Sequence, residues 1–289
     1  MRSEQEMFSL ILRTAKEDER IRAVYMNGSR TNPNAPRDIF QDYDIVYVVK
    51  ETRSFREDRG WIDRFGKRLF MQYPEESPFF PSDVENCYGW LIQLADGNRL
   101  DLHVQTVPYA VREIRKDRLC KILLDKDGLL PAMPAPTDED YWIKRPTEAE
   151  FLAVCNEFWW CLNNVAKGIA RDELPYAMEM FQKYVRDMLN EMVRWAIGVR
   201  TGFTVSAGKC GKYFKRYLPE SQYRLYAQTY ASGDYPSLWA AVFTACELFR
   251  LTAGEVGAYF AFAYDEREDQ NMTAYLLAVK TQWEQAGPP

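Results

Sequence analysis

The stretch FQDYDIVYVV, residues 40–49, decides how the N-terminal half of the chain is interpreted. Residues 45–49 are an unbroken run of β-branched and aromatic side chains, which is typical of a central strand of a sheet. Asp42 and Asp44 stand just before this run. Because residues i and i+2 of a strand point to the same face, the two carboxylates converge on one side. The sequence therefore predicts a buried strand that begins with a pair of acidic side chains.

A pair of carboxylates in this position indicates a metal site. Two ionised carboxylates held close together are costly unless a positive charge neutralises them. Mg²⁺ does so, and it typically takes one or two protein carboxylates together with substrate phosphates. A third carboxylate, Asp101, lies between Leu100 and Leu102 in another strand pattern, where an aspartate is expensive unless it binds something. We therefore expect Asp42, Asp44 and Asp101 to ligate magnesium, with two metal ions possible.

The turn after an earlier strand pattern, residues 21–26, is the expected phosphate site. Gly28 permits close approach of the backbone, and the backbone N–H groups and the Ser29 hydroxyl can donate hydrogen bonds to phosphate oxygens. Each signal is weak alone, since aspartates are common in exposed turns. A strand, Gly-Ser, an Asp-x-Asp pair with apolar flanks and a further aspartate between leucines, in this order, form a much more specific pattern.

The remaining patterns predict an α+β protein of two domains. An amphipathic helix capped by Ser3 is expected over residues 3–18, and a β-hairpin is expected where 87–94 and 100–107 flank an Asp-Gly turn. The proline-rich segment 131–136 indicates a linker, so we expect a first domain with a mixed sheet at 1–136 and a helical bundle at 137–289. In the second domain helices are predicted at 147–170, with a capping box, and at 174–199, 209–218, 220–231 and 236–262.

Composition narrows the possible functions. The 289 residues suit two domains, and the formal charge of −5 argues against a nucleic-acid binder and fits a small cationic substrate better. Six scattered cysteines without a C-x-x-C pair indicate reduced core thiols. The start of the chain is too charged for a signal peptide, and no run reaches the length of a membrane span. We therefore expect a cytoplasmic, monomeric protein without membrane or nucleic-acid partners.

The missing motifs exclude other enzyme classes. The chain has a single histidine, His103, which disfavours a histidine-rich zinc site and a Ser-His-Asp triad. Neither a P-loop motif nor a G-x-G-x-x-G fingerprint is present. His103 lies two residues after Asp101 and on the same strand face. It either touches the site or serves as a structural histidine, and the sequence leaves both open.

Several motifs together resemble the aminoglycoside 6-adenylyltransferases, the streptomycin-inactivating enzymes. The resemblance runs in collinear order to about residue 255. It is carried by Gly28–Asn32, Phe40–Asp44 and Asp96–Leu102, and it continues through 123–127, 141–146, 156–159, 166–168, 208–212 and 215–218. It implies a nucleotidyltransferase-fold domain, a helical domain and an active site in the cleft between them. The implied reaction transfers AMP from Mg²⁺·ATP to the 6-hydroxyl of streptomycin and releases pyrophosphate.

The resemblance also assigns roles to individual residues. Asp42 and Asp44 match the metal-binding aspartates, and Asp101 matches a third carboxylate that ligates metal or deprotonates the acceptor hydroxyl. Contacts with the triphosphate are implied for the remaining matches, which are Gly28, Ser29, Arg30, Lys209 and Lys212. His103 departs from the family pattern, which leaves the local geometry of the acceptor open.

Streptomycin carries two guanidinium groups and an amine, so its site is expected to present carboxylates and aromatic faces. Glu157 and Trp159 on the first long helix are the candidates, together with His103. Each also has an ordinary interpretation, as a helix carboxylate, a core tryptophan and a structural histidine. Two other functions stay open: adenylylation of another acceptor, either a different aminoglycoside or a protein, and nucleotide binding without catalysis. Fold alone does not decide among them.

Overall fold

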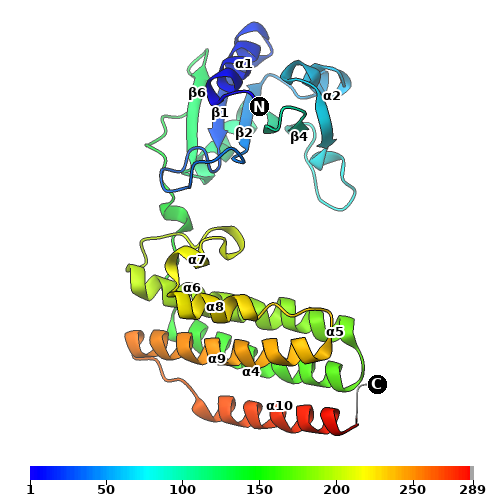
Figure 1. Cartoon of the computed structure of the whole chain (residues 1–289). Coiled ribbons are helices and arrows are strands. Elements are labelled where there is room, and N and C mark those ends of the chain that lie inside the picture. The colour runs from blue at the N-terminus through cyan, green and yellow to red at the C-terminus, as the bar shows by residue number, and fades with distance from the viewer. Residues whose placement is uncertain (287–289) are drawn as a thin grey trace. The chain divides into compact units, whose positions relative to one another are not determined.

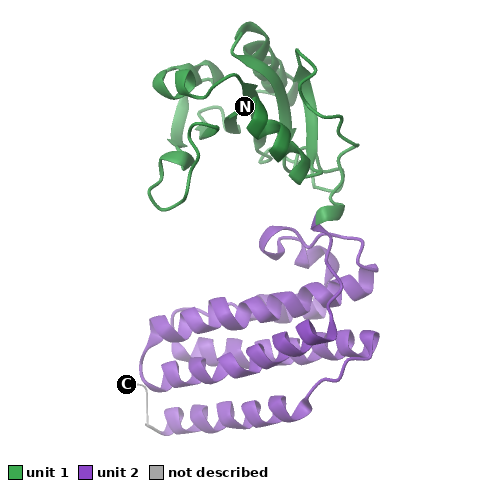
Figure 2. Cartoon of the chain, turned by 180° about the vertical axis from the view of Figure 1, so that it is seen from behind, with its two compact units in different colours: residues 1–140 green, residues 141–289 purple. Residues whose placement is uncertain are grey.

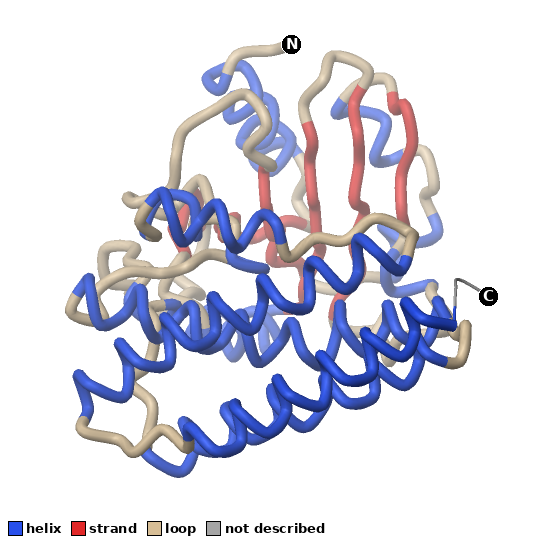
Figure 3. The backbone as a smooth tube through the Cα atoms, turned by 60° about the horizontal axis from the view of Figure 1, so that its bottom comes forward, coloured by secondary structure: helices blue, strands red, loops and turns tan. Residues whose placement is uncertain are grey.

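The computed structural model describes residues 1–286 and divides into two compact units, residues 1–140 and 141–289 (Figure 2). The boundary expected after residue 136 falls in the extended segment that precedes this division. Strands are confined to the first unit, and the second consists of helices and loops (Figure 3). The α+β class, with a mixed sheet followed by a helical region, is therefore confirmed.

The first unit is built on a six-stranded sheet with the order β3-β4-β5-β2-β1-β6. The central strands β2 and β5 are parallel, and the other neighbouring pairs are antiparallel. The hairpin predicted around the Asp-Gly turn is present as β4 and β5. The strands are β1 (Ile21–Asn27), β2 (Tyr43–Val49), β3 (Arg68–Gln72), β4 (Cys87–Leu94), β5 (Arg99–Thr106) and β6 (Cys120–Asp125) (Figure 1).

The two faces of the sheet are covered by different helices. One face carries a core in which α1, α2 and η1 pack on alternate residues of the strands, among them Ile45, Tyr47 and Trp90. The opposite face carries a smaller core under α3 and η3, which includes Val46 and Val48. The helical segments of this unit are α1 (Glu4–Glu17), α2 (Arg53–Glu57), η1 (Trp61–Phe65), η2 (Pro74–Glu76), α3 (Val107–Glu113), η3 (Ile114–Lys116) and η4 (Glu139–Tyr141).

The second unit is a bundle of long helices around one apolar core. The core forms because α4, α6, α9 and α10 contact one another along their apolar stripes (Figure 1). The helices are α4 (Glu148–Ala170), α5 (Leu174–Glu179), the π-helical turn η5 (Met180–Val185), α6 (Arg186–Thr201), η6 (Lys209–Gly211), α7 (Phe214–Tyr217), α8 (Glu220–Gln228), α9 (Tyr235–Phe260) and α10 (Glu266–Ala286).

The N-terminal caps predicted for two helices are present, and a glycine ends a third helix. Ser3 and Thr147 each accept a backbone N–H at the start of their helix in a capping box, and Gly202 ends α6 with a φ of 66°. The single helix predicted over 209–218 is wrong. Gly208, Cys210 and Gly211 all have positive φ, so the chain turns there and only Phe214–Tyr217 becomes α-helical.

Two expectations from composition can be compared with the structure. All six cysteines are free, but Cys210 is exposed, so it is not the core thiol that the sequence predicted. It lies in the strained turn before α7 instead of on a packed helix face. Within residues 1–286, no helix combines the length and apolar character needed to span a bilayer.

Candidate active site

The parallel pairing of β2 and β5 places two predicted carboxylates side by side. Asp44 is the register partner of Asp101, and because directly paired residues of neighbouring strands project to the same face, both side chains share one surface of the sheet. Further along β2, the same face carries the apolar side chains of Val46 and Val48, which pack under α3. The acidic pair therefore occupies the part of this face that the small core leaves uncovered.

The turn after β1 fits closely against Asp44. Gly28 has a φ of +76°, and a Cβ built on it would lie 2.1 Å from Asp44 Oδ2. No side chain larger than hydrogen can occupy this position without displacing the carboxylate. The carbonyl of Gly28 accepts hydrogen bonds from the Thr31 amide, at 3.1 Å, and from the Thr31 hydroxyl, at 2.8 Å. The Gly28 turn is thus fixed against the carboxylate that the sequence assigned to metal.

Arg30 holds the loop that carries Asp42. Its guanidinium donates to the carbonyl oxygens of Asp42, at 3.0 Å, and Gln41, at 2.8 Å, and it lies 3.7 Å from the ring centroid of Tyr43. The Arg30 residue is only 8% exposed. The amide of Gln41 donates to the carbonyl of Ser29, which ties the loop to the Gly28 turn. Arg30 is therefore a structural clamp here, and its contact with triphosphate stays a prediction.

The electrostatics of the three aspartates favour a cation. Burial, followed by the nearby charges of Asp101 and Asp42, raises the pKa of Asp44 to about 6. Crowded carboxylates of this kind are relieved by a hard divalent ion with oxygen ligands. Two carboxylates and the oxygens of a nucleotide are a normal donor set for Mg²⁺. The residues present at Asp42 and Asp44 therefore fit the expected metal.

Asp101 forms a close ion pair with an arginine. Arg99 binds both of its carboxylate oxygens, at 2.9 and 2.7 Å, and also lies 3.6 Å from Asp42 Oδ2. Among residues 1–286, no group of three or more His, Cys, Asp or Glu side chains converges as a metal-binding set. The third-ligand role of Asp101 therefore stays a prediction, and it requires Arg99 to release the carboxylate.

His103 lies on the same face as Asp101, and the structure adds a residue that the sequence did not indicate. A Cβ on its register partner Gly89 would lie 2.4 Å from His103 Cδ2, so the imidazole rests directly over the glycine. Burial lowers the pKa of His103. Its Nε2 lies 3.6 Å from Glu75 Oε1, in η2. Glu75 follows a proline in a turn and belongs to no motif, so no sequence pattern singles it out.

Comparisons with known proteins agree on one family. The streptomycin adenylyltransferase family matches residues 1–279. The chain is 42% identical to the aminoglycoside 6-adenylyltransferase of Bacillus subtilis, over 96% of this chain and 98% of that protein. It is 38% identical to the aminoglycoside 6-adenylyltransferase of Campylobacter jejuni, over 98% of both chains. The crystal structure of an aminoglycoside 6-adenyltransferase from Bacillus subtilis is 37% identical, covers 97% of this chain and 99% of its own, and superimposes with a TM-score of 0.48.

The chain belongs to the streptomycin adenylyltransferase family. The family resemblance inferred from the sequence is thereby confirmed, and so is the expectation of a nucleotidyltransferase.

Other members of the predicted site lie in the second unit of this family member. Lys209 and Lys212 are exposed in the glycine-rich turn before α7. The Lys212 ammonium lies 5.2 Å from the ring centroid of Tyr213, and a Cβ on Gly208 would contact the Lys212 side chain. The lysines therefore project from a shaped turn instead of a helix start, and their contact with phosphate stays a prediction.

The two candidate acceptor residues on α4 differ in exposure. Glu157 is exposed and accepts a hydrogen bond from Cys161 Sγ at 3.2 Å. Trp159 is only 2% exposed and packs edge-to-face on Phe158 and Phe249 in the bundle core. Trp159 therefore stabilises the bundle, whatever it contributes to a ligand. The assignment of both residues to the acceptor stays a prediction.

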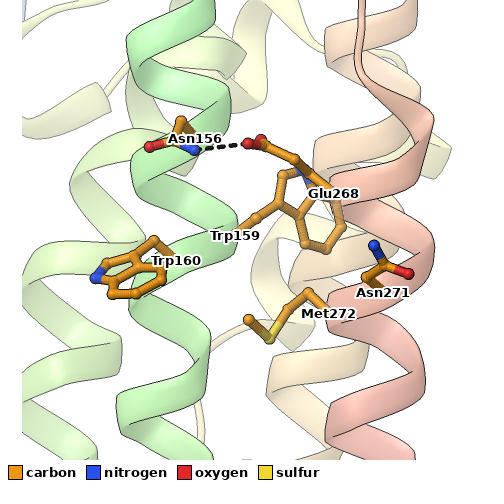
Figure 4. Close-up of a pocket in the computed structure, with 6 residues that line it drawn as sticks. All are labelled: Asn156, Trp159, Trp160, Glu268, Asn271 and Met272. Carbon is orange, nitrogen blue, oxygen red and sulfur yellow. Dashed lines mark hydrogen bonds between the residues drawn. The ribbon is translucent and has the colours of Figure 1, made fainter.

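A pocket of about 280 Å³ opens between α4 and α10. Figure 4 shows the side chains of Trp159 and Met272 between the two helices and Asn156 donating to Glu268, at 2.7 Å. Trp159 contributes to its lining, whereas Glu157 does not. The pocket is mainly apolar and belongs entirely to the second unit.

Proposed function

We propose that this protein transfers AMP from Mg²⁺·ATP to the 6-hydroxyl of streptomycin and releases pyrophosphate. The observation that carries the proposal is the pairing of Asp44 with Asp101 in adjacent parallel strands, with the Gly28 turn packed against Asp44. Membership of the streptomycin adenylyltransferase family, whose match covers residues 1–279, supports the same proposal.

The chain's own residues supply positioning and charge for this reaction. Asp42 and Asp44 would hold Mg²⁺, which when bound neutralises charge on the phosphates. The backbone of the Gly28 turn and the Ser29 hydroxyl would bind phosphate oxygens, and Lys209 and Lys212 would add positive charge. Phosphoryl-type transfer depends mainly on such positioning and electrostatic stabilisation.

The transfer step needs one proton acceptor. The acceptor oxygen forms a bond to the α-phosphorus, and the bond from that phosphorus to the β-phosphate oxygen breaks. The hydroxyl proton passes to a carboxylate within about 3 Å. Asp101 is our candidate for this carboxylate, because it neighbours Asp44 on the same face and becomes available when Arg99 moves away.

A direct test is incubation of the purified protein with ATP, MgCl₂ and a panel of aminoglycosides, followed by mass spectrometry for an added AMP and an assay for pyrophosphate. We expect one AMP on streptomycin and one pyrophosphate per transfer. An AMP on a different aminoglycoside alone would change the acceptor and keep the reaction. No transfer to any acceptor, with no Mg²⁺-dependent ATP binding, would overturn the proposal.

A further inference from the structure

Glu75 is anchored beside the acidic face by a backbone amide. It lies in η2, directly after β3, and its Oε2 accepts the N–H of Gly89 at 2.9 Å. Gly89 lies beyond the last residue of β4 that pairs with β3, so this N–H has no partner in β3. A buried backbone donor needs an acceptor, and Glu75 supplies it. One oxygen of the carboxylate is thereby fixed in place.

The other carboxylate oxygen points toward the active face. Glu75 Oε1 lies 3.6 Å from His103 Nε2, which is longer than a hydrogen bond. The imidazole occupies the space that the missing Cβ of Gly89 leaves over β4. About 7 Å separates positions i and i+2 of a strand, so His103 and Asp101 stand roughly one sugar ring apart. Glu75 therefore faces the same surface of the sheet as His103 and the aspartates.

Among the described residues, the basic side chain that lies within ion-pair distance of Glu75 is that of His103, at 3.6 Å. Among residues 1–286, no lysine or arginine forms an ion pair with it, although its side chain is only 15% exposed. The next residue, Glu76, behaves differently: Arg59 lies 2.8 Å from its carboxylate and Tyr88 donates to it at 2.5 Å. Glu76 is thus held by Arg59 and Tyr88, whereas one oxygen of Glu75 makes no hydrogen bond to a described residue and can accept one from a ligand.

We infer that Glu75 binds a cationic group of the acceptor and so fixes which hydroxyl reaches the nucleotide. This inference rests on the proposed function. A guanidinium group is the favoured partner, because its planar donors match a carboxylate whose position is already fixed. Streptomycin carries two such groups. Glu75 would therefore act as a specificity residue in the first unit, next to the residues that hold the nucleotide.

The test compares Glu75→Gln with Glu76→Gln in steady-state kinetics. Glutamine keeps an oxygen that can accept the Gly89 N–H, so the fold is preserved while the charge is removed. For Glu75→Gln we expect the KM for streptomycin to rise by about ten- to hundredfold, with the KM for ATP and kcat little changed. Glu76→Gln, the matched control, should leave the KM for streptomycin unchanged.

A second acceptor separates binding from a folding defect. In a streptomycin derivative whose guanidino groups are converted to uncharged ureido groups, Glu75→Gln should raise the KM no further. An equal rise for both acceptors, or an unchanged KM for streptomycin, would overturn the inference.

Calorimetric titration of streptomycin into wild type and Glu75→Gln reads binding without turnover. Weaker binding to the variant would support the role of Glu75 even if no AMP transfer occurs, in which case only the proposed reaction fails. Equal binding to both proteins, with AMP transfer intact, would remove the role of Glu75 and keep the reaction.

Discussion

The two units of this chain use their sequences differently. The first unit leaves charged side chains on one face of a sheet and fixes them by strand register, as with Asp44 opposite Asp101. The second unit buries long apolar stripes in a single core and leaves its charged residues mostly exposed. Strand pairing fixes the position of a carboxylate, whereas the side chain of an exposed lysine on a turn keeps many rotamers. We therefore expect changes in the first unit to affect catalysis and changes in the second to affect stability or affinity.

The largest effect is expected for Asp44→Asn. If the carboxylate holds the metal, its loss removes several kcal/mol of transition-state stabilisation, so the rate of AMP transfer should fall by about a thousandfold or more. Thermal stability should be unchanged or higher, because a crowded, buried carboxylate is removed. The measurement is kcat with a thermal melt of the same sample.

Asp63→Asn is the matched control for this change. Asp63 lies in the same unit, is about half exposed and pairs with Arg68 on the surface. Its kcat should equal that of wild type. Near-normal turnover of Asp44→Asn would contradict the catalytic role of the first unit, because the metal would then not bind at the carboxylates that strand pairing brings together.

The second prediction tests the second unit as a packing domain. Trp159→Ala should lower the free energy of unfolding by about 3–5 kcal/mol, since a buried tryptophan is removed from the core. Trp160→Ala is the control, because Trp160 is 64% exposed, and its cost should stay below about 0.5 kcal/mol. Urea denaturation measures both values. If Trp159→Ala costs as little as Trp160→Ala, the tryptophan is not a core residue.

Gly28→Ala gives the third test, and the chain offers a close control. The new Cβ would meet Asp44 Oδ2, and a displacement of about 1 Å at a reacting centre can cost about a hundredfold in rate. Gly128→Ala introduces a similar strain, because its φ is +65°, but it meets nothing within 4 Å. Both variants should lose some stability, and only Gly28→Ala should lose most of its kcat. An equal kcat for the two would show that the turn does not position Asp44.

The sequence predicts those elements whose signal lies in a few neighbouring residues. The cap at Ser3, the capping box at Thr147 and the strand after Asp42 follow from the sequence, because each depends on residues a few positions apart. The pairing of Asp44 with Asp101 needed the sheet order, which patterns suggest but do not fix. Helix α10 and strand β6 were not predicted from periodicity, since tertiary packing stabilises them.

The candidate site shows the same limit at the level of side chains. The aspartates and Gly28 are recognisable because a carboxylate in a strand and a glycine in a turn each have a local cost that needs a reason. Glu75 has no such cost in the sequence. Its position depends on the N–H of Gly89, which has no strand partner because the pairing of β3 with β4 ends before Gly89. Likewise, the clamp formed by Arg30 depends on carbonyls that the loop presents only after folding.

The smallest effect is expected for Lys209→Ala and Lys212→Ala, which ask whether the second unit also takes part in nucleotide binding. A charge-assisted contact with phosphate contributes about 1.5–3 kcal/mol, and exposure reduces this, so the KM for ATP should rise by about tenfold. Lys215→Ala is the control, because Lys215 is also exposed and stands three residues further along the chain. Its KM for ATP should stay at the wild-type value, and the melting temperature of all three variants should be unchanged, since none of the lysines is buried. A rise in the KM for streptomycin equal to that for ATP would point to a disturbed turn instead of a lost phosphate contact. An unchanged KM for ATP in both Lys209→Ala and Lys212→Ala would confine nucleotide binding to the first unit and make the difference between the two units sharper than we propose.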